Sequence, residues 1–121
     1  MPTMALLIEL GFKTNTDGFC YLRNAIIMKI EHPELRFIPI YSDVGRIYGQ
    51  GANYQQVERV IRNAIGYACK RGNREKWDYF FPYRHLEKRG CPPDGAFIAQ
   101  IACILEIWTV CAKEVSLDGA K

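Results

Sequence analysis

Polar side chains that can read nucleic acid are concentrated between Asn53 and Asn73, in the stretch NYQQVERVIRNAIGYACKRGN. Its polar positions offer arginine, glutamine, asparagine and a single glutamate. Side chains of these types can bond both the edges of bases and the phosphates of a duplex. Many surface helices carry a few arginines, so this stretch taken alone favours an ordinary solvated surface over DNA binding.

The spacing of its apolar residues predicts that this stretch is an amphipathic helix. At about 100° per residue, one apolar stripe consists of Val57, Ile61, Ala64, Ile65 and Ala68. The opposite face carries Gln55, Arg59, Arg62, Gly66 and Lys70. Asn53 is the expected N-cap, Gln56 is its expected capping-box partner, and Gly72 is the expected left-handed stop.

A shorter helix is predicted just before this one. Tyr41 to Tyr48 reads as a helix capped by Ser42, and Gly49 to Ala52 reads as a turn. The segment from Leu35 to Ile40 contains a proline and is expected to be extended. A short helix, a glycine-containing turn and a longer polar-faced helix form the helix-turn-helix pattern, here at about residues 41–72. This pattern shifts the balance toward DNA binding.

The rest of the chain also reads as helical. The remaining helices are expected at about Thr3 to Leu10, Gly18 to Glu31, Arg74 to Phe81 and Asp94 to Cys111. Asp94 is the expected cap of the last one, and the basic segment from Tyr83 to Gly90 is expected to be a solvated loop that includes Arg84 and an exposed His85. The predicted fold is all-α, with about six helices and a central helix-turn-helix. Residues 1–121 are expected to form a single domain.

The last predicted helix is apolar almost all round, interrupted by Gln100, Glu106 and Thr109. It has fewer than the roughly 20 apolar residues of a bilayer span and contains a glutamate, so we expect no membrane insertion. One of its two apolar stripes can pack on the core, and the other would need cover from a second copy of the chain. This predicts a homodimer contact formed by Ile104, Ile107, Trp108 and Val110.

Charge and reactive residues exclude several other classes of function. The net charge of +3 is too small by itself to indicate a nucleic-acid partner, but residues 58–89 hold nine Lys or Arg against four Asp or Glu. This excess is the footprint expected of a phosphate-facing surface, although proteins that bind nothing also carry such asymmetry. The five cysteines form no CxxC pair and are expected to be reduced thiols in a cytoplasmic protein. With His32 and His85 they give no metal-ligand spacing. No catalytic triad, paired carboxylate or glycine-rich phosphate loop occurs, so we expect no enzyme, cofactor, metal or small-molecule substrate. The N-terminus also lacks the features of a secretion signal.

Five short sequence motifs also resemble those of one known family. They are Tyr21-Leu22-Arg23-x-Ala25-Ile26, Glu31-x-Pro33-Glu34, Val57-Glu58-Arg59-x-Ile61-Arg62-x-Ala64-Ile65, Arg71-Gly72-Asn73 and Phe97-Ile98-Ala99. In this order, from about Leu7 to about Leu105, the chain resembles the C-terminal DNA-binding domain of the stage-zero sporulation protein A family. The members of that family are response regulators that commit endospore-forming bacteria to sporulation. The family's N-terminal receiver domain has no counterpart in these 121 residues, so a chain of this extent would not be switched by phosphorylation in the family's way.

The resemblance implies an all-helical domain of a winged-helix-like or response-regulator effector type. It also implies that the domain binds tandem sites as a head-to-tail dimer, with its recognition helix, here residues 53–72, in the major groove. It implies base contacts from Glu58 and Arg59, because glutamate accepts from cytosine and arginine bonds guanine. It also implies a phosphate contact from Arg62, and we expect further backbone contacts from Tyr54, Gln55, Asn63 and Lys70.

Three features differ from the family's pattern. Gln56 stands where an arginine is usual, Asn63 stands where a histidine is usual, and the turn GQGANYQQ is about two residues longer. Since glutamine pairs with adenine where arginine favours guanine, we expect Gln56 to contact a base and to shift the preferred site.

Two hypotheses for the function follow. The first is a sequence-specific transcriptional regulator, which the retained Glu58, Arg59 and Arg62 favour. The second is a protein-interaction module that keeps the fold and pairs with or antagonises a full-length regulator, which the longer turn and the very apolar last helix favour. We prefer the first hypothesis.

Overall fold

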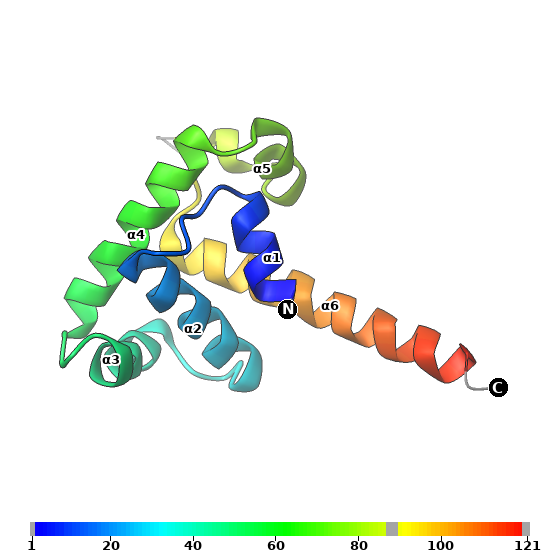
Figure 1. Ribbon diagram of the computed structural model, residues 1–121, viewed down its shortest axis with the longest axis horizontal. Helices are drawn as coiled ribbons and strands as arrows, with labels where there is room; N and C mark the ends of the chain where they lie inside the picture. The colour runs from blue at the N-terminus through cyan, green and yellow to red at the C-terminus, as the bar shows by residue number, and fades with distance from the viewer. Residues whose placement is uncertain (1, 87–89, 120–121) are drawn as a thin grey trace.

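The predicted all-α fold is confirmed. The computed structural model describes the backbone of residues 2–86 and 90–119 and the side chains of residues 3–86 and 90–111. Within these residues there are six α-helices, one short 3-10 helix and no strand, so no β wing is present there (Figure 1). The helices are α1 Pro2–Glu9, α2 Asp17–Glu31, α3 Phe37–Tyr48, α4 Tyr54–Arg71, α5 Arg74–Phe80 and α6 Asp94–Gly119, with the 3-10 helix at Arg84–Leu86.

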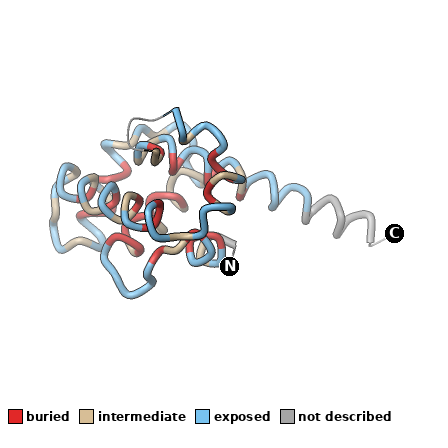
Figure 2. Tube along the Cα trace, turned by 90° about the horizontal axis from the view of Figure 1, so that it is seen from above, coloured by how far each residue is buried: buried red, intermediate tan, exposed pale blue. Residues whose placement is uncertain are grey.

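Helix α2 lies at the centre of the fold and packs against α3, α4 and α6. Its side chains Leu22, Ala25 and Ile26 are completely buried. The buried residues among those described lie in the rounded part of the molecule (Figure 2), whereas the C-terminal end of α6 extends away from it (Figure 1). The core therefore fixes the inner faces of α3 and α4 and leaves their outer faces to solvent.

Helix α3 begins four residues before the predicted start at Tyr41. The segment from Leu35 to Ile40 is therefore mostly helical, and the expectation of an extended connector was wrong. The N-cap is Arg36, and Ser42 is an exposed residue within the helix. Proline is compatible with this start because Pro39 lies in the first turn, where a backbone N–H has no partner within the helix.

The turn between α3 and α4 is held tightly against α3. The amides of Gly49 and Gly51 both donate to the carbonyl oxygen of Gly45, each at 3.0 Å. Gln50 and Gly51 have positive φ values of 54° and 86°. A Cβ atom at Gly45 would overlap the carbonyl of Ala52, so glycine at this position allows the turn to lie on the helix.

Helix α4 has the predicted capping at its start and a different ending. Asn53 accepts from the amide of Gln56, and Gln56 accepts from the amide of Asn53, each at 2.9 Å, which forms the predicted capping box. Gly72 is extended, with φ −80° and ψ −177°, and is not the predicted left-handed stop. Glycine is needed there because a Cβ atom would overlap the carbonyl oxygen of Leu10.

Helix α6 begins at Asp94, which is its first helical residue rather than the cap outside it. The Asp94 carboxylate accepts a 2.6 Å hydrogen bond from the hydroxyl of Tyr41 on α3. Burial, followed by this hydrogen bond, raises the pKa of the Tyr41 phenol well above its ordinary value. The contact joins the helix-turn-helix to the last helix.

By length and composition α6 is long and apolar enough to cross a bilayer, because its segment Asp94–Cys111 has a mean hydropathy of 1.5. This differs from our expectation that the helix is too short and too polar. Core helices of soluble proteins pass the same test. The first half of α6 packs into the core of this domain, since Phe97, Ile98 and Ile101 are completely buried.

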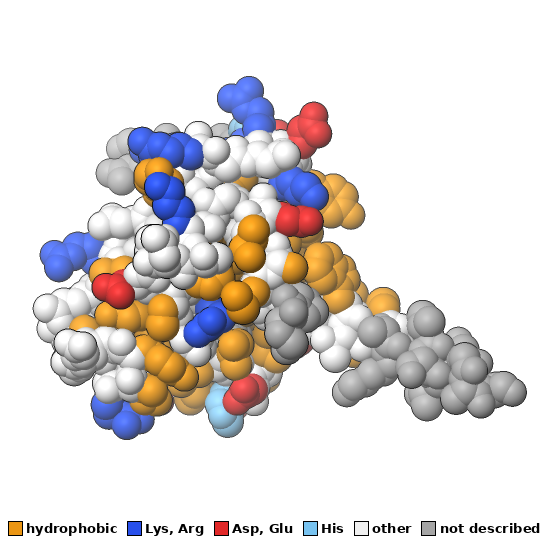
Figure 3. All heavy atoms as spheres, in the orientation of Figure 1, with side chains coloured by type: hydrophobic (Ala, Val, Ile, Leu, Met, Phe, Trp, Pro, Cys, Tyr) orange, Lys and Arg blue, Asp and Glu red, His pale blue; other side chains and the backbone are white. Residues whose placement is uncertain are grey.

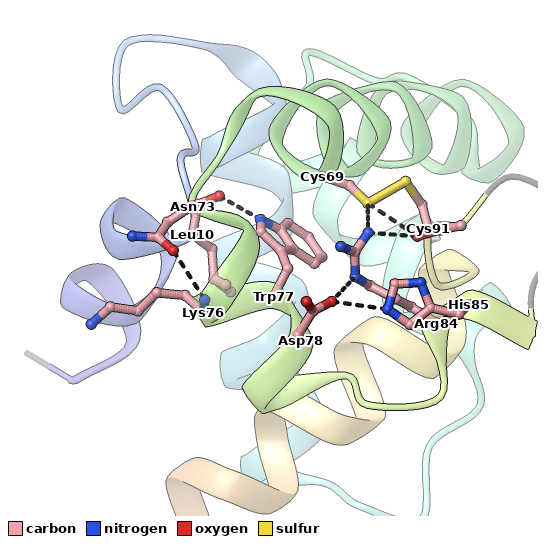
Figure 4. Close-up of polar contacts among 10 residues, drawn as sticks. Leu10, Cys69, Asn73, Lys76, Trp77, Asp78, Arg84, His85 and Cys91 are labelled. Carbon is pink, nitrogen blue, oxygen red and sulfur yellow. Dashed lines mark hydrogen bonds and ion pairs between the residues drawn. A yellow bond between two sulfur atoms is a disulfide. The ribbon is translucent and has the colours of Figure 1, made fainter.

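Cys69 at the end of α4 and Cys91 before α6 form a disulfide, so the expectation that all the cysteines are reduced was wrong (Figure 4). The chain reversal after α5 brings two cysteines together that lie 22 residues apart. Cys20, Cys103 and Cys111 are free thiols.

Arg84 lies beside this disulfide and is not a solvated loop residue as predicted. Its side chain is 10% exposed, donates to Asp78 at 2.9 Å and donates to the Gly90 carbonyl at 2.9 Å (Figure 4). His85 is exposed, as expected, and lies 3.1 Å from the same Asp78 carboxylate oxygen. The remaining residues of the predicted loop, 87–89, lie outside the described residues.

Candidate nucleic-acid interface

The polar face of α4 is exposed because the opposite face forms part of the core. Val57, Ile61 and Ile65 are buried on the inner face. The structure brings the predicted contact residues together on this one helix. Those with exposed side chains are Gln55, Gln56, Arg59, Arg62, Asn63 and Lys70. Glu58 and Tyr54 are half-buried, and Tyr54 also packs against the core.

Two of the predicted contact residues bind each other in the free protein. Arg62 donates to the carboxylate of Glu58 at 2.6 Å, across one turn of the helix. Both side chains remain accessible, with 56% and 36% exposure. This ion pair would have to rearrange if Glu58 bonds a base while Arg62 bonds a phosphate.

Gln56 combines a capping role in α4 with a predicted base contact. Its amide oxygen is occupied by the backbone amide of Asn53 in the capping box. Its amide nitrogen has no hydrogen-bond partner within the part of the chain that the structure describes. The side chain can therefore donate to a base or a phosphate from its present position, whereas two simultaneous bonds to adenine require the cap to open.

Among the residues predicted to contact bases, Arg59 is the one whose side-chain donors are bound by none of the described residues. It is exposed and makes no hydrogen bond or ion pair with any residue that the structure describes. It lies between Gln55 and Asn63, one turn away in each direction along the outer face. An unpaired guanidinium on a capped and packed helix can bond the two acceptors of guanine without breaking an existing contact.

A basic cluster at the end of α4 was not predicted from the sequence. The guanidinium carbon of Arg71 lies 4.1 Å from the ring centre of Tyr67, and the Nζ of Lys13 lies 4.9 Å from the same ring. Figure 3 shows Lys and Arg side chains gathered over the C-terminal half of α4. The four-residue spacing of Tyr67 and Arg71 on a helix could have indicated their contact, but Lys13 comes from the segment between α1 and α2 and only the fold places it there.

These features define the class of protein to which the domain belongs. An all-helical domain in which α3, a glycine-containing turn and a longer helix α4 present an exposed basic face is a helix-turn-helix DNA-binding domain. Residues 3–105 match the family model described as "Sporulation initiation factor Spo0A C terminal", and the chain belongs to this family. The protein is therefore a sporulation-related DNA-binding regulator domain, and its family is not a family of enzymes.

Proposed function

We propose that this domain is a sequence-specific transcriptional regulator that inserts the start of α4 into the major groove of duplex DNA. The observation that carries the proposal is Arg59, which is exposed and pairs with none of the described residues, on the outer face of a helix fixed by its cap and its core contacts. In this arrangement Gln56, Glu58 and Arg59 contact bases. The contacts to the DNA backbone come from Tyr54, Gln55, Arg62, Asn63 and Lys70.

The test compares the loss of a base contact with the loss of a phosphate contact. Arg59→Ala should weaken specific binding by about 1–3 kcal/mol and relax the preference at one base. Arg62→Ala should weaken all sequences alike and reduce the salt dependence by about one contact. Lys76→Ala is the matched control, because Lys76 lies on α5 and pairs with Glu9 instead. If Arg59→Ala and Arg62→Ala both behave like this control on duplex DNA at low salt, α4 does not bind DNA.

We also propose that a second copy of the chain covers the exposed apolar side of α6. Ile107, Trp108 and Val110 are 55%, 44% and 53% exposed, whereas Ile104 packs partly against the core. Large apolar side chains at neighbouring positions of one helix favour association. We place this regulator, a single domain over residues 1–121, in the bacterial cytoplasm, where its DNA target is.

The same apolar side of α6 supports a second candidate function. A module that pairs with a full-length regulator through α6 would use this surface for a different protein and would leave Arg59 unused. Binding of duplex DNA that depends on Arg59 therefore separates the two candidates.

A further inference from the structure

Gly66 leaves a gap in the outer face of α4 that packing within the chain does not require. Beyond the adjacent backbone of α4 itself, a Cβ atom added at Gly66 would meet no atom of the described residues within 4 Å, whereas one at Gly18 or Gly45 would collide with a neighbouring helix or turn. Glycine destabilises the interior of a helix relative to alanine. The missing side chain at Gly66 therefore creates room for something outside the chain.

Cationic residues surround this gap. The gap opens into a recess of about 460 Å³, which we call the Gly66 recess. It is lined on the helix by Arg62, Asn63, Gly66, Tyr67, Lys70 and Arg71. Its other wall is formed by Cys91, Pro92 and Pro93. Within the described part of the chain no Asp or Glu lines it, so its charged groups are all positive.

Two of the walls are held in place by other contacts. Arg71 stacks on the Tyr67 ring, with its guanidinium carbon 4.1 Å from the ring centre, and Lys13 approaches the same ring to 4.9 Å. Hydrogen bonding and charge from Lys13 lower the pKa of the Tyr67 phenol from its ordinary value. On the opposite side, the disulfide with Cys69 fixes Cys91 to α4. A recess with fixed walls loses little conformational freedom when it binds an anion.

If the start of α4 lies in the major groove of DNA, the length of α4 places the Gly66 recess beyond the base edges at the bottom of that groove. Helix α4 has 18 residues, which corresponds to about 27 Å, whereas the major groove is about 12 Å wide. Gly66 follows Arg59 by two turns, or about 10 Å along the axis. When the first turns of α4 reach the bases, the recess therefore lies at the level of the sugar-phosphate backbone.

We propose that the Gly66 recess binds phosphodiester groups of the DNA backbone that flanks the bases read by the start of α4. This inference rests on the proposed function and extends its contacts to Gly66 and Arg71. Arg71 and Lys70 supply positive charge, and the absence of a side chain at Gly66 lets the backbone approach the helix. The recess adds affinity and salt dependence without adding base preference.

Filling the recess tests this proposal without removing a charge. Gly66→Met places a long uncharged side chain in the gap, and Gly66→Ala, which adds a single methyl group, is the graded comparison. Both replacements favour the helix, so both variants should unfold at the same temperature as the wild type or higher. Gly66→Met should bind a long duplex about tenfold more weakly, with a salt dependence reduced by one to two contacts, and should keep its base preference. Gly66→Ala should weaken binding by less than Gly66→Met does, because a methyl group fills only part of the gap.

A second variant tests the charge itself. Arg71→Gln should reduce the salt dependence by about one contact on a long duplex. It should have no effect on a duplex trimmed to the base pairs that α4 reads, because the flanking phosphates are then missing.

The results of these experiments distinguish a failure of the recess proposal from a failure of the proposed function. If Arg59→Ala relaxes base preference but Gly66→Met and Arg71→Gln bind long duplexes as the wild type does, the proposed function stands and the recess proposal is wrong. If inorganic triphosphate binds the free protein saturably, Gly66→Met abolishes that binding, and duplex binding is unchanged in this variant, the ligand is a free phosphate compound and the proposal is again wrong. A wild-type protein that retains no duplex contradicts both proposals.

Discussion

Arg62 and Glu58 form an ion pair across one turn of α4, with the guanidinium nitrogen 2.6 Å from the carboxylate oxygen. Both residues are proposed DNA contacts. In the free protein, therefore, the arginine proposed to bind a phosphate is paired with the glutamate proposed to contact a base. Exposed pairs at this helical spacing contribute only about 0.3–0.5 kcal/mol. DNA can therefore displace the pair at little cost.

Replacing the glutamate tests this relationship. Glu58→Gln should lower the free energy of unfolding by less than about 0.5 kcal/mol, since the pair is exposed. It should strengthen binding to unrelated duplexes, because a carboxylate near the phosphates is lost and Arg62 is released. Urea unfolding and duplex titrations at several salt concentrations measure both effects. Weaker binding to every duplex would mean that Glu58 positions Arg62 instead of competing for it.

Gln56 combines a capping role with a proposed base contact, and two substitutions separate them. Gln56→Arg removes the acceptor of the capping box and should cost about 0.5–1 kcal/mol of stability. It should also shift the preferred base from adenine toward guanine. Gln56→Glu keeps the cap and should lose the adenine preference without this loss of stability. Unfolding and site-preference measurements on both variants decide it, and an unchanged preference in both would show that Gln56 does not read a base.

The Cys69–Cys91 disulfide is expected to stabilise the end of α4. It closes a loop with a sequence separation of 22 residues, for which the chain-entropy relation gives about 3 kcal/mol. Reducing agent, or Cys69→Ser together with Cys91→Ser, should lower the unfolding free energy by up to that amount. Cys103→Ser is the control, because Cys103 is an exposed free thiol. Equal stability with and without reductant would argue that the two thiols are not paired in solution.

The exposed side of α6 gives a prediction about oligomeric state. Light scattering of the wild type at micromolar concentration, without DNA, should show a dimer, because Ile107 and its neighbours are exposed apolar residues. Ile107→Lys should give a monomer of unchanged stability, since the residue is 55% exposed in one copy. A wild type that is strictly monomeric would contradict the dimer and leave this surface available to a different protein.

The sequence predicted the helices best where local signals agree. Asn53, Gln56 and the apolar stripe of α4 all specify the same helix start and inner face, and the structure has both. The start of α3 was predicted too late because Pro39 was expected to favour an extended segment, although the first turn of a helix accepts proline. The Cys69–Cys91 pair was missed because it depends on the chain reversal after α5, which no local pattern encodes.

The candidate interface was predictable to a similar extent. The outward direction of Arg59 follows from helical periodicity, and the structure leaves this residue exposed. The Glu58–Arg62 pair could also have been read from the four-residue spacing. The Gly66 recess could not, because Cys91, Pro92 and Pro93 reach α4 only through the tertiary fold.

Selection of bound duplexes from a random DNA pool tests the central claim most directly. The wild type should enrich one short sequence motif, and Arg59→Ala, selected in parallel, should enrich the same motif with one position relaxed. Enrichment of no motif by the wild type, or of an identical motif by both proteins, would contradict the claim that α4 reads DNA sequence through Arg59.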